Sequence, residues 1–374
     1  MRLTINIILC SILVLSVLLL AACGSNVSVK QAALPPYQYS VNSDSQRDDR
    51  KQLLQQFVAN KLTGSHGIYT NYIDTAQNEL AATGHEVLSE SMGLLMRVYA
   101  LTRDQIQFDK AWELAEQTFA MESGFSYRFS PKLNKLYSVN AAVDDLRMIR
   151  ALYEAEEAFA NKRYGELADK LSARFMKHNV RDGKLFDFYD NEHNMTNAFI
   201  TLCYIDLRTL QLTPEGDKKD VLAQSMHSII QGGYLSDDFP FYETRYDYSS
   251  EQYESDEIRT VESLLTILSL VEVGQHHPKS IDFIKKQVQQ GTLYGRYTRD
   301  GQPLTTIQST AIYAITAMIG SMLGDQSLYE DSMSRMEQFQ VLQQQSELYG
   351  AYGDIESLQA FSFDNLMALL AYAY

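Results

Sequence analysis

Four acidic side chains stand at or near the starts of predicted apolar helices, where they could carry out acid–base chemistry. Glu90 follows Ser89 at the start of one helix, Asp144 and Asp145 lie in the first turn of a second, and Asp256 begins a third. A reaction in which one group protonates a leaving atom and another activates water uses two such carboxyls. Helix capping is the alternative explanation, because acids are common in first turns.

Helical periodicity dominates from residue 46 onward, strand patterns are nearly absent, and two kinds of helix alternate along the chain. One kind is apolar on nearly all sides, which is typical of a fully buried helix, and the other is amphipathic. The predicted apolar helices are 89–102, 141–159, 194–210, 256–273, 306–322 and 356–372. The predicted amphipathic helices are 46–62, 108–120, 163–176, 218–230, 279–289 and 326–341.

Six buried helices alternating with six half-buried ones predict an all-α fold, an (α/α)6 barrel with an inner and an outer ring. A helical-repeat solenoid is the alternative, but it would show a repeat of roughly 34 residues with a recurring consensus. The spacing here is irregular and no consensus recurs. We therefore expect one barrel domain at 46–374, preceded by a signal peptide at 1–22 and a tether at 23–45.

The segments that enter the predicted inner helices are long, and the segments that leave them are short. All inner helices of such a barrel run in the same direction, so the long segments gather at one end. Functional groups are commonly carried by long loops on a rigid scaffold, and we expect the site at this end. The long segments are 63–88, 121–140, 177–193, 232–255, 291–305 and 342–355.

The N-terminus has the features of an export signal. A basic start, Met1-Arg2, precedes an apolar run over 5–20 and the sequence Leu20-Ala21-Ala22-Cys23. This pattern resembles the lipobox of bacterial lipoproteins and predicts lipidation of Cys23 and anchorage at the extracytoplasmic face of the cell membrane. A plain signal peptide or an N-terminal membrane anchor is the alternative. Cys203 is then the remaining thiol, predicted to be buried and inert in a helix.

Composition excludes several classes of partner and cofactor. The net charge of −15, spread along the chain, disfavours nucleic-acid binding. The seven histidines lack the close spacing of metal ligands, so no metal is predicted. Phosphate-loop, dinucleotide-binding and serine-hydrolase motifs are missing from the sequence, and we expect no cofactor.

Several motifs resemble glycoside hydrolase family 8, whose members are inverting endoglycosidases acting on β-1,4 glucan, xylan and chitosan. The motifs, in chain order, are Ser89-Glu90-Ser91-Met92-Gly93 for S-E-G-x-G, Phe108-Asp109-x-x-Trp112 for F-D-x-x-W, 141–159 for the A-[ST]-D-[AG]-D signature helix, and Asp256-x-x-Arg259 for D-A-x-R. The resemblance spans about 46–374 and implies the same barrel. It implies that Glu90 is the general acid and Asp256 the base.

The resemblance also suggests roles for three further charged residues. Asp144 and Asp145 are expected to contact the sugar and to tune Glu90, whereas Arg259 is expected to orient the base and keep it ionised. An ordinary intrahelical ion pair between Arg259 and Glu262 is the alternative. An inverting reaction of this kind needs the two catalytic carboxyls roughly 6.5–9.5 Å apart.

Departures from the family motifs concern substrate contacts. Ser91 replaces a glycine, Val143 replaces the first aspartate of the signature, Ser255 replaces a tyrosine, and Val261-Glu262 replaces a Pro-Trp pair. These changes imply either remodelled sugar contacts or lost catalysis. We favour remodelling, because both the acid and the base of the motifs are present.

Tyrosine rather than tryptophan would supply the stacking surfaces for sugars. The chain has 24 Tyr and one Trp, and Trp112 lies on a predicted outer helix. Packing of the loops is the alternative role for any one tyrosine. The stacking candidates at the long-loop end are Tyr127, Tyr137, Tyr242, Tyr246, Tyr248 and Tyr294.

The resemblance implies a membrane-anchored, inverting glycoside hydrolase that cleaves an extracellular β-linked polysaccharide, namely an exopolysaccharide. A polysaccharide synthase complex is the implied protein partner. The competing interpretation is a catalytically inactive lipoprotein that keeps the fold and binds or helps to export polysaccharide, which the Val143 departure favours. A helical-repeat interaction protein of the envelope is a third, weaker interpretation.

Overall fold

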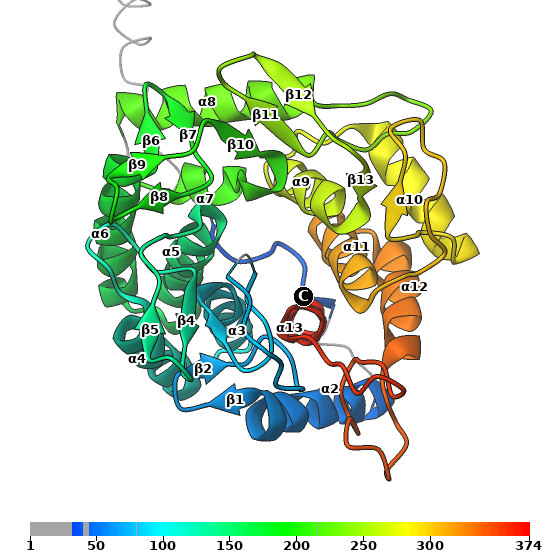
Figure 1. Ribbon diagram of the computed structural model, residues 1–374. Helices are drawn as coiled ribbons and strands as arrows, with labels where there is room; N and C mark the ends of the chain where they lie inside the picture. Colours follow the sequence, from blue (N-terminus) through cyan, green and yellow to red (C-terminus); the bar gives the residue numbers. More distant parts are fainter. Residues whose placement is uncertain (1–31, 40–44, 80, 215) are drawn as a thin grey trace, which may run out of the picture. The chain divides into compact units, whose positions relative to one another are not determined.

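Twelve α-helices, among the residues that the structure describes, form two concentric rings (Figure 1). The computed structural model describes residues 32–39, 45–79, 81–214 and 216–374. The predicted signal peptide, Cys23 and most of the predicted tether lie outside these residues. Within the described part, no helix is long and apolar enough to cross a membrane.

The inner ring closes on itself. Each inner helix contacts the next one along the chain, and the last, α13, contacts the first, α3. This cyclic contact confirms the (α/α)6 barrel and excludes an open solenoid, in which the first and last helices do not meet. The inner helices are α3 (Ser89–Leu101), α5 (Ala142–Phe159), α7 (Leu207–Leu212), α9 (Thr260–Glu272), α11 (Thr310–Leu323) and α13 (Ser362–Ala371).

The outer helices bury one stripe each against the inner ring, as their amphipathic sequences predict. In α6, for example, Tyr164, Ala168 and Leu171 are buried at helical spacing. The α2 helix continues as a π-helix over Val58–Leu62, and α12 continues as a 3-10 helix over Glu337–Phe339. The outer helices are α2 (Ser45–Phe57), α4 (Gln105–Phe119), α6 (Lys162–His178), α8 (Asp217–Gly232), α10 (Pro278–Gln290) and α12 (Gln326–Met336).

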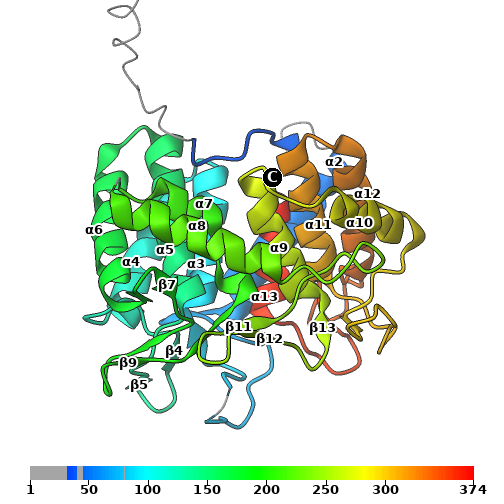
Figure 2. The same ribbon diagram turned by 90° about the horizontal axis from the view of Figure 1, so that it is seen from above.

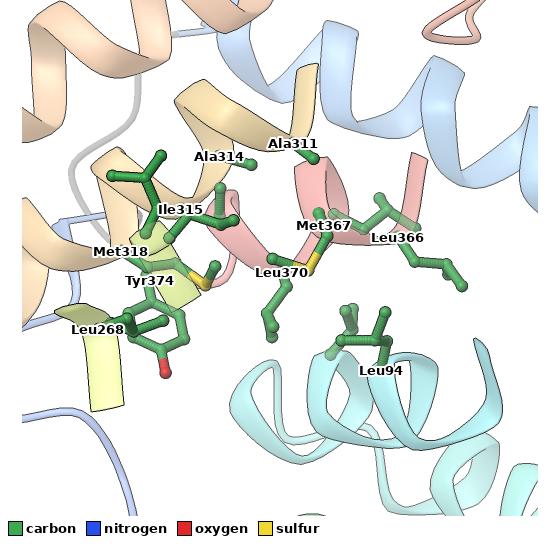
Figure 3. Close-up of a cluster of buried hydrophobic side chains, with 14 of the residues drawn as sticks. Leu94, Leu268, Ala311, Ala314, Ile315, Met318, Leu366, Met367, Leu370 and Tyr374 are labelled. Carbon is green, nitrogen blue, oxygen red and sulfur yellow. The ribbon is translucent and has the colours of Figure 1, made fainter. Parts of the chain in front are cut away.

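Apolar side chains from several inner helices meet inside the ring. Leu94 of α3, Leu268 of α9 and Leu370 of α13 extend toward one another (Figure 3), and each is at most 7 % exposed. Met318 of α11 and the C-terminal Tyr374 complete this cluster. The predicted burial of the inner helices on all sides is therefore confirmed, and the centre of the ring is packed with side chains.

Toward the C-terminal ends of the inner helices, the core contains a buried network of charged groups. Arg97 of α3 donates to Glu154 of α5 at 2.8 Å and to the Tyr374 hydroxyl at 2.9 Å. Arg150 donates to the same Glu154 at 3.0 Å and to Glu272 of α9 at 2.9 Å. This network ties three inner helices and the C-terminus together.

The long segments between outer and inner helices contain short antiparallel strands, which the sequence did not predict. Each strand has only two or three residues, too few to show an alternating pattern. The strands before residue 197 are β1 (Thr63–Gly64), β2 (Gly67–Ile68), β3 (Val87–Leu88), β4 (Arg128–Ser130), β5 (Lys135–Leu136), β6 (Val180–Arg181), β7 (Lys184–Leu185), β8 (Tyr189–Asp190) and β9 (Met195–Thr196). The remaining strands are β10 (Phe199–Thr201), β11 (Arg245–Asp247), β12 (Gln252–Glu254), β13 (Ile258–Arg259) and β14 (Arg296–Tyr297).

The predicted helix over 194–210 is wrong for most of its length. The segment forms β9, β10 and a 3-10 helix, Leu202–Tyr204, and only α7 at its end is α-helical. The cause is tertiary, because β10 pairs with β11, which lies more than 40 residues further along the chain. The inner ring therefore has one short helix, and the strand and 3-10 helix that precede it contribute residues to the cleft.

The described chain begins at the end of the barrel opposite the strands (Figure 2). The Ala33 N–H donates to Glu157 Oε2 near the C-terminal end of α5 at 2.6 Å, and Ser321 near the end of α11 donates to the Tyr37 carbonyl. Residues 33–39, which the sequence placed in the tether, thus pack on the barrel.

Candidate active site

A cleft of about 560 Å³ lies at the strand-bearing end of the barrel, as expected from the lengths of the loops. The N-terminal parts of three inner helices contribute four charged groups: Glu90 from α3, Asp144 and Arg147 from α5, and Glu262 from α9. The segments between the helices add Tyr127, Asp187, Phe199, Thr201, Cys203, Tyr204 and Arg245, and the start of α13 adds Phe363. This concave shape with converging ionisable groups is typical of an active site.

One guanidinium joins the acids of two inner helices. Arg147 Nη1 lies 3.1 Å from Glu90 Oε2 and 2.8 Å from Asp144 Oδ1. The other Asp144 oxygen accepts a hydrogen bond from the Ser89 hydroxyl at 3.3 Å. Because Ser89 and Glu90 open α3 whereas Asp144 and Arg147 open α5, these contacts confirm that Glu90 and Asp144 meet in space.

Burial raises the pKa of two carboxyls that line the cleft. Burial raises the pKa of Asp144 to about 7, against the opposing effect of Arg147, and the negative charges of Glu90 and Asp145 raise it further. Burial likewise raises the pKa of Asp187 to about 6, although two hydrogen bonds from Thr201 lower it. At pH values near 6 to 7, a substantial fraction of the Asp144 and Asp187 carboxyls is therefore protonated.

We expect the free energy of unfolding to decrease as the pH rises from about 4 to about 7. The folded-state pKa of Asp144 is raised from 3.8 to about 7, so the stability that it contributes is fully present below 3.8 and is lost as the pH rises through about 7. Urea denaturation at a series of pH values measures this slope. Asp144→Asn keeps an acceptor for Arg147 and should flatten the slope; an unchanged slope in this variant would contradict the assignment.

Asp145 is next to Asp144 in the chain but faces away from the cleft. Its carboxylate accepts hydrogen bonds from Asn140 Nδ2 at 2.6 Å and from the Phe125 N–H at 2.9 Å. Burial raises its pKa to about 7, and these two hydrogen bonds lower it. Successive helical side chains diverge by about 100°, and this rotation places Asp145 against Asn140 and Phe125 rather than in the cleft wall. The sugar contact expected of Asp145 is not part of this geometry, whereas that of Asp144 is.

Asp256 does not line the cleft that holds Glu90. The α9 helix begins at Thr260 rather than at residue 256, and Asp256 is exposed in the loop between β12 and β13. The cleft wall described above does not include it. The cause is the pairing of β13 with β14, which keeps residues 258–259 extended and delays the start of the helix.

Arg259 pairs with Glu262, as in the alternative interpretation of its role. Its Nε lies 3.3 Å from Glu257 Oε1 and its Nη1 lies 3.8 Å from Glu262 Oε1. Its side chain is 63 % exposed, so this interaction with Glu262 is screened by solvent. The expected orientation of Asp256 by Arg259 is therefore replaced by ion pairs with two glutamates.

Comparisons with known proteins agree with this fold. The chain is 30 % identical to a solved alpha-amylase from Clostridium perfringens, covering 87 % of this chain and 97 % of that one with a TM-score of 0.80. A solved family 8 endoglucanase from Klebsiella pneumoniae, Cel10, shares the fold over 86 % of this chain and 98 % of its own, at 16 % identity and a TM-score of 0.59. The chain belongs to the same family as the Clostridium perfringens alpha-amylase, and it shares its fold with the family 8 glycoside hydrolases.

A curated relative adds information on the class of protein. YdaJ of Bacillus subtilis (strain 168), named as a lipoprotein, is 26 % identical over 293 residues, covering 76 % of this chain and 78 % of YdaJ. No protein-family model matches the chain. Together these relatives support a glycoside hydrolase-like function for this family 8-like protein.

The tyrosine candidates divide between the cleft and the loop core. Tyr127 lines the cleft, and Tyr137 lies beside it with ring centroids 6.1 Å apart. Tyr137 does not itself line the cleft; Arg128 and Lys135 lie over its ring. Tyr242 is buried, and the Tyr248 hydroxyl donates to the Leu185 carbonyl, so both pack the loops.

The sequence did not identify four charged residues of the cleft as site residues: Arg147, Asp187, Arg245 and Glu262, the last of which was expected only as an ion-pair partner of Arg259. A signal existed for Arg147, which lies three residues after Asp144 and thus on the same helical face. Asp187 and Arg245 lie near or in strands that were not predicted. Both Asp187 oxygens accept from Thr201, at 2.6 Å from its N–H and 2.6 Å from its hydroxyl, which joins the loop after β7 to β10.

Cys203 differs from its prediction in location and in exposure, because it is half-buried in the cleft wall rather than fully buried. It is a free thiol in a 3-10 helix of the cleft wall rather than in an inner α-helix. Burial raises its pKa well above the ordinary value, which keeps the thiol protonated. Among the described residues, no group of three or more His, Cys, Asp or Glu is arranged to hold a metal ion.

Proposed function

We propose that this protein is a membrane-anchored glycoside hydrolase that cleaves an extracellular β-linked polysaccharide with inversion at the anomeric carbon. The observation that carries the proposal is the convergence of Glu90, Asp144 and Arg147 at one end of a family 8-like barrel, in a cleft with an aromatic wall. Glu90 protonates the leaving oxygen while a second carboxylate activates water. Asp144 is joined to Glu90 through Arg147 and contacts the sugar. Its protonation is coupled to the charge of Glu90.

The family motif assigns the second carboxylate to Asp256. The proposed substrate is an exopolysaccharide of the producing cell. A reducing-end assay on exopolysaccharide purified from the source organism tests the proposal, with proton NMR of the fresh products to determine the anomeric configuration. Inverted products are expected. Retained configuration would overturn the mechanism, and binding without cleavage would favour the inactive polysaccharide-binding lipoprotein.

An α-linked glucan is a second candidate substrate, because the relative at 30 % identity is named an alpha-amylase. The same assay on amylose, carboxymethylcellulose and xylan separates the two linkages. Cleavage of amylose alone would replace the β-linked proposal while keeping the site. A polysaccharide synthase complex remains the proposed protein partner.

The lipid anchor on Cys23 supports an extracytoplasmic location at the cell membrane. The chain that leads toward Cys23 meets the barrel at Ala33, at the end opposite the cleft.

We expect Cys23→Ser to release the protein from the membrane fraction or to block its maturation, because the lipid is attached to this thiol. Immunoblots of membrane and soluble fractions measure the effect. Cys203→Ser is the matched control, since it removes a thiol of the barrel and should leave the protein in the membrane. Normal processing and unchanged membrane retention of Cys23→Ser would contradict the lipoprotein assignment.

A further inference from the structure

The acid of the proposed reaction has a counterpart on the opposite side of the ring. The α3 helix contacts α5 and α13, whereas α9 contacts α7 and α11, so α3 and α9 face each other across the barrel. Glu90 is the second residue of α3 and Glu262 the third residue of α9, and both line the cleft. An inverting reaction requires its two carboxyls on opposite faces of the sugar ring.

One carboxylate oxygen of Glu262 accepts no hydrogen bond from the described protein atoms. Its Oε2 atom is buried and has no hydrogen-bond partner among the described protein atoms, while Oε1 lies 3.8 Å from Arg259 Nη1. A buried carboxylate oxygen without a partner costs free energy, and in a cleft wall it indicates a donor that arrives with the ligand. A water molecule or a sugar hydroxyl is such a donor.

The other carboxylates of the cleft are already engaged. Asp144 accepts from Arg147 and Ser89, and Asp187 accepts with both oxygens from Thr201. Asp256 is exposed and lies outside the cleft wall. Glu262 is thus the cleft carboxylate, apart from Glu90, that can take a new proton without losing an existing hydrogen bond.

We infer that Glu262, rather than Asp256, is the general base that activates water; the inference rests on the proposed glycosidase function. Glu262 Oε2 takes a proton from a water molecule, whose oxygen forms a bond to the anomeric carbon. The bond from that carbon to the glycosidic oxygen breaks, and the leaving oxygen takes the proton of Glu90. Glu262 ends protonated and Glu90 ionised, and solvent exchange resets both.

The surroundings of Glu262 suit this role. Arg259 provides a positive charge that favours the ionised form, although burial raises the pKa above the ordinary value of 4.5. The base works in its ionised form, so the rate should fall as the pH falls through this raised pKa. Glu262 also occupies a position where the family motif has tryptophan, so this chain has exchanged an aromatic contact for a carboxylate.

The test compares Glu262→Gln with Asp256→Asn on a polysaccharide that the wild-type protein cleaves. Glu262→Gln should lower kcat by ~10²–10⁴-fold with little change in KM, and it should lose the fall in rate at low pH. Asp256→Asn should retain kcat within a few-fold. Azide should restore turnover of Glu262→Gln and give a glycosyl azide of inverted configuration, because azide attacks the anomeric carbon without needing a base.

The outcomes separate the inference from the function on which it rests. Near-wild-type turnover by Glu262→Gln together with loss of turnover in Asp256→Asn would overturn the inference and keep the glycosidase. Loss of turnover in Glu262→Gln without azide rescue, with weakened binding of an oligosaccharide in calorimetry, would also overturn it, since that result marks a structural role. A wild-type protein that cleaves none of the polysaccharides would overturn both the function and the inference.

Discussion

Replacing Glu90 by glutamine should lower kcat on a cleaved polysaccharide by ~10²–10⁴-fold while leaving substrate affinity nearly unchanged. Glutamine keeps the size of the side chain and an oxygen that can accept from Arg147, which lies 3.1 Å from Glu90 Oε2. It cannot deliver a proton to the leaving oxygen. Steady-state kinetics by reducing-end assay and oligosaccharide binding by calorimetry measure the two quantities separately.

The leaving group provides an internal control for this prediction. The fluoride ion of a glycosyl fluoride leaves without being protonated. Glu90→Gln should therefore cleave a glycosyl fluoride of the same sugar with a much smaller loss of rate than it shows on the polysaccharide. Equal losses on both substrates would indicate that Glu90 supports the fold of the cleft rather than acting as the acid. Wild-type turnover of the polysaccharide by Glu90→Gln would show that the acid assignment is wrong.

The rings of the barrel could be predicted because burial determines composition. A helix packed between an outer helix and the core must be apolar on most sides, and α3 and α5 were predicted to within a residue or two of their observed ends. The short α7 could not be predicted. Phe199–Thr201 are extended because they pair with Arg245–Asp247. Pairing between residues so far apart in the chain leaves no local pattern in the sequence.

The site residues that lie at the starts of helices could be predicted from the sequence, whereas those that lie in loops could not. Glu90 and Asp144 lie in first turns whose positions were predicted correctly, and Arg147 joins them. Asp256 was placed by a motif at a helix start that the structure shifts to Thr260, because Ile258 and Arg259 pair with β14. A shift of four residues moves a side chain from the cleft wall to an exposed loop, and Glu262 takes the position inside the cleft.

The second large effect concerns stability. Glu154→Ala should lower the free energy of unfolding by ~3–5 kcal/mol, because Glu154 is fully buried and accepts from both Arg97 and Arg150. Its removal leaves two buried guanidinium groups short of a counter-charge. Urea denaturation followed by circular dichroism measures the change. Glu154→Gln, which keeps an acceptor but not the charge, should show a smaller loss.

An exposed ion pair provides the matched control for this stability prediction. Arg245 and Glu254 pair on neighbouring strands with both side chains 44 % exposed, and Glu254→Gln should cost at most about 1 kcal/mol. If Glu154→Ala costs no more than this control, the buried network does not hold the inner ring together. Glu154 lies ten residues after Asp144 on α5, roughly 15 Å along the helix axis, so a folded Glu154→Ala protein should still bind substrate. Loss of binding in that folded variant would show that the network also fixes the geometry of the cleft.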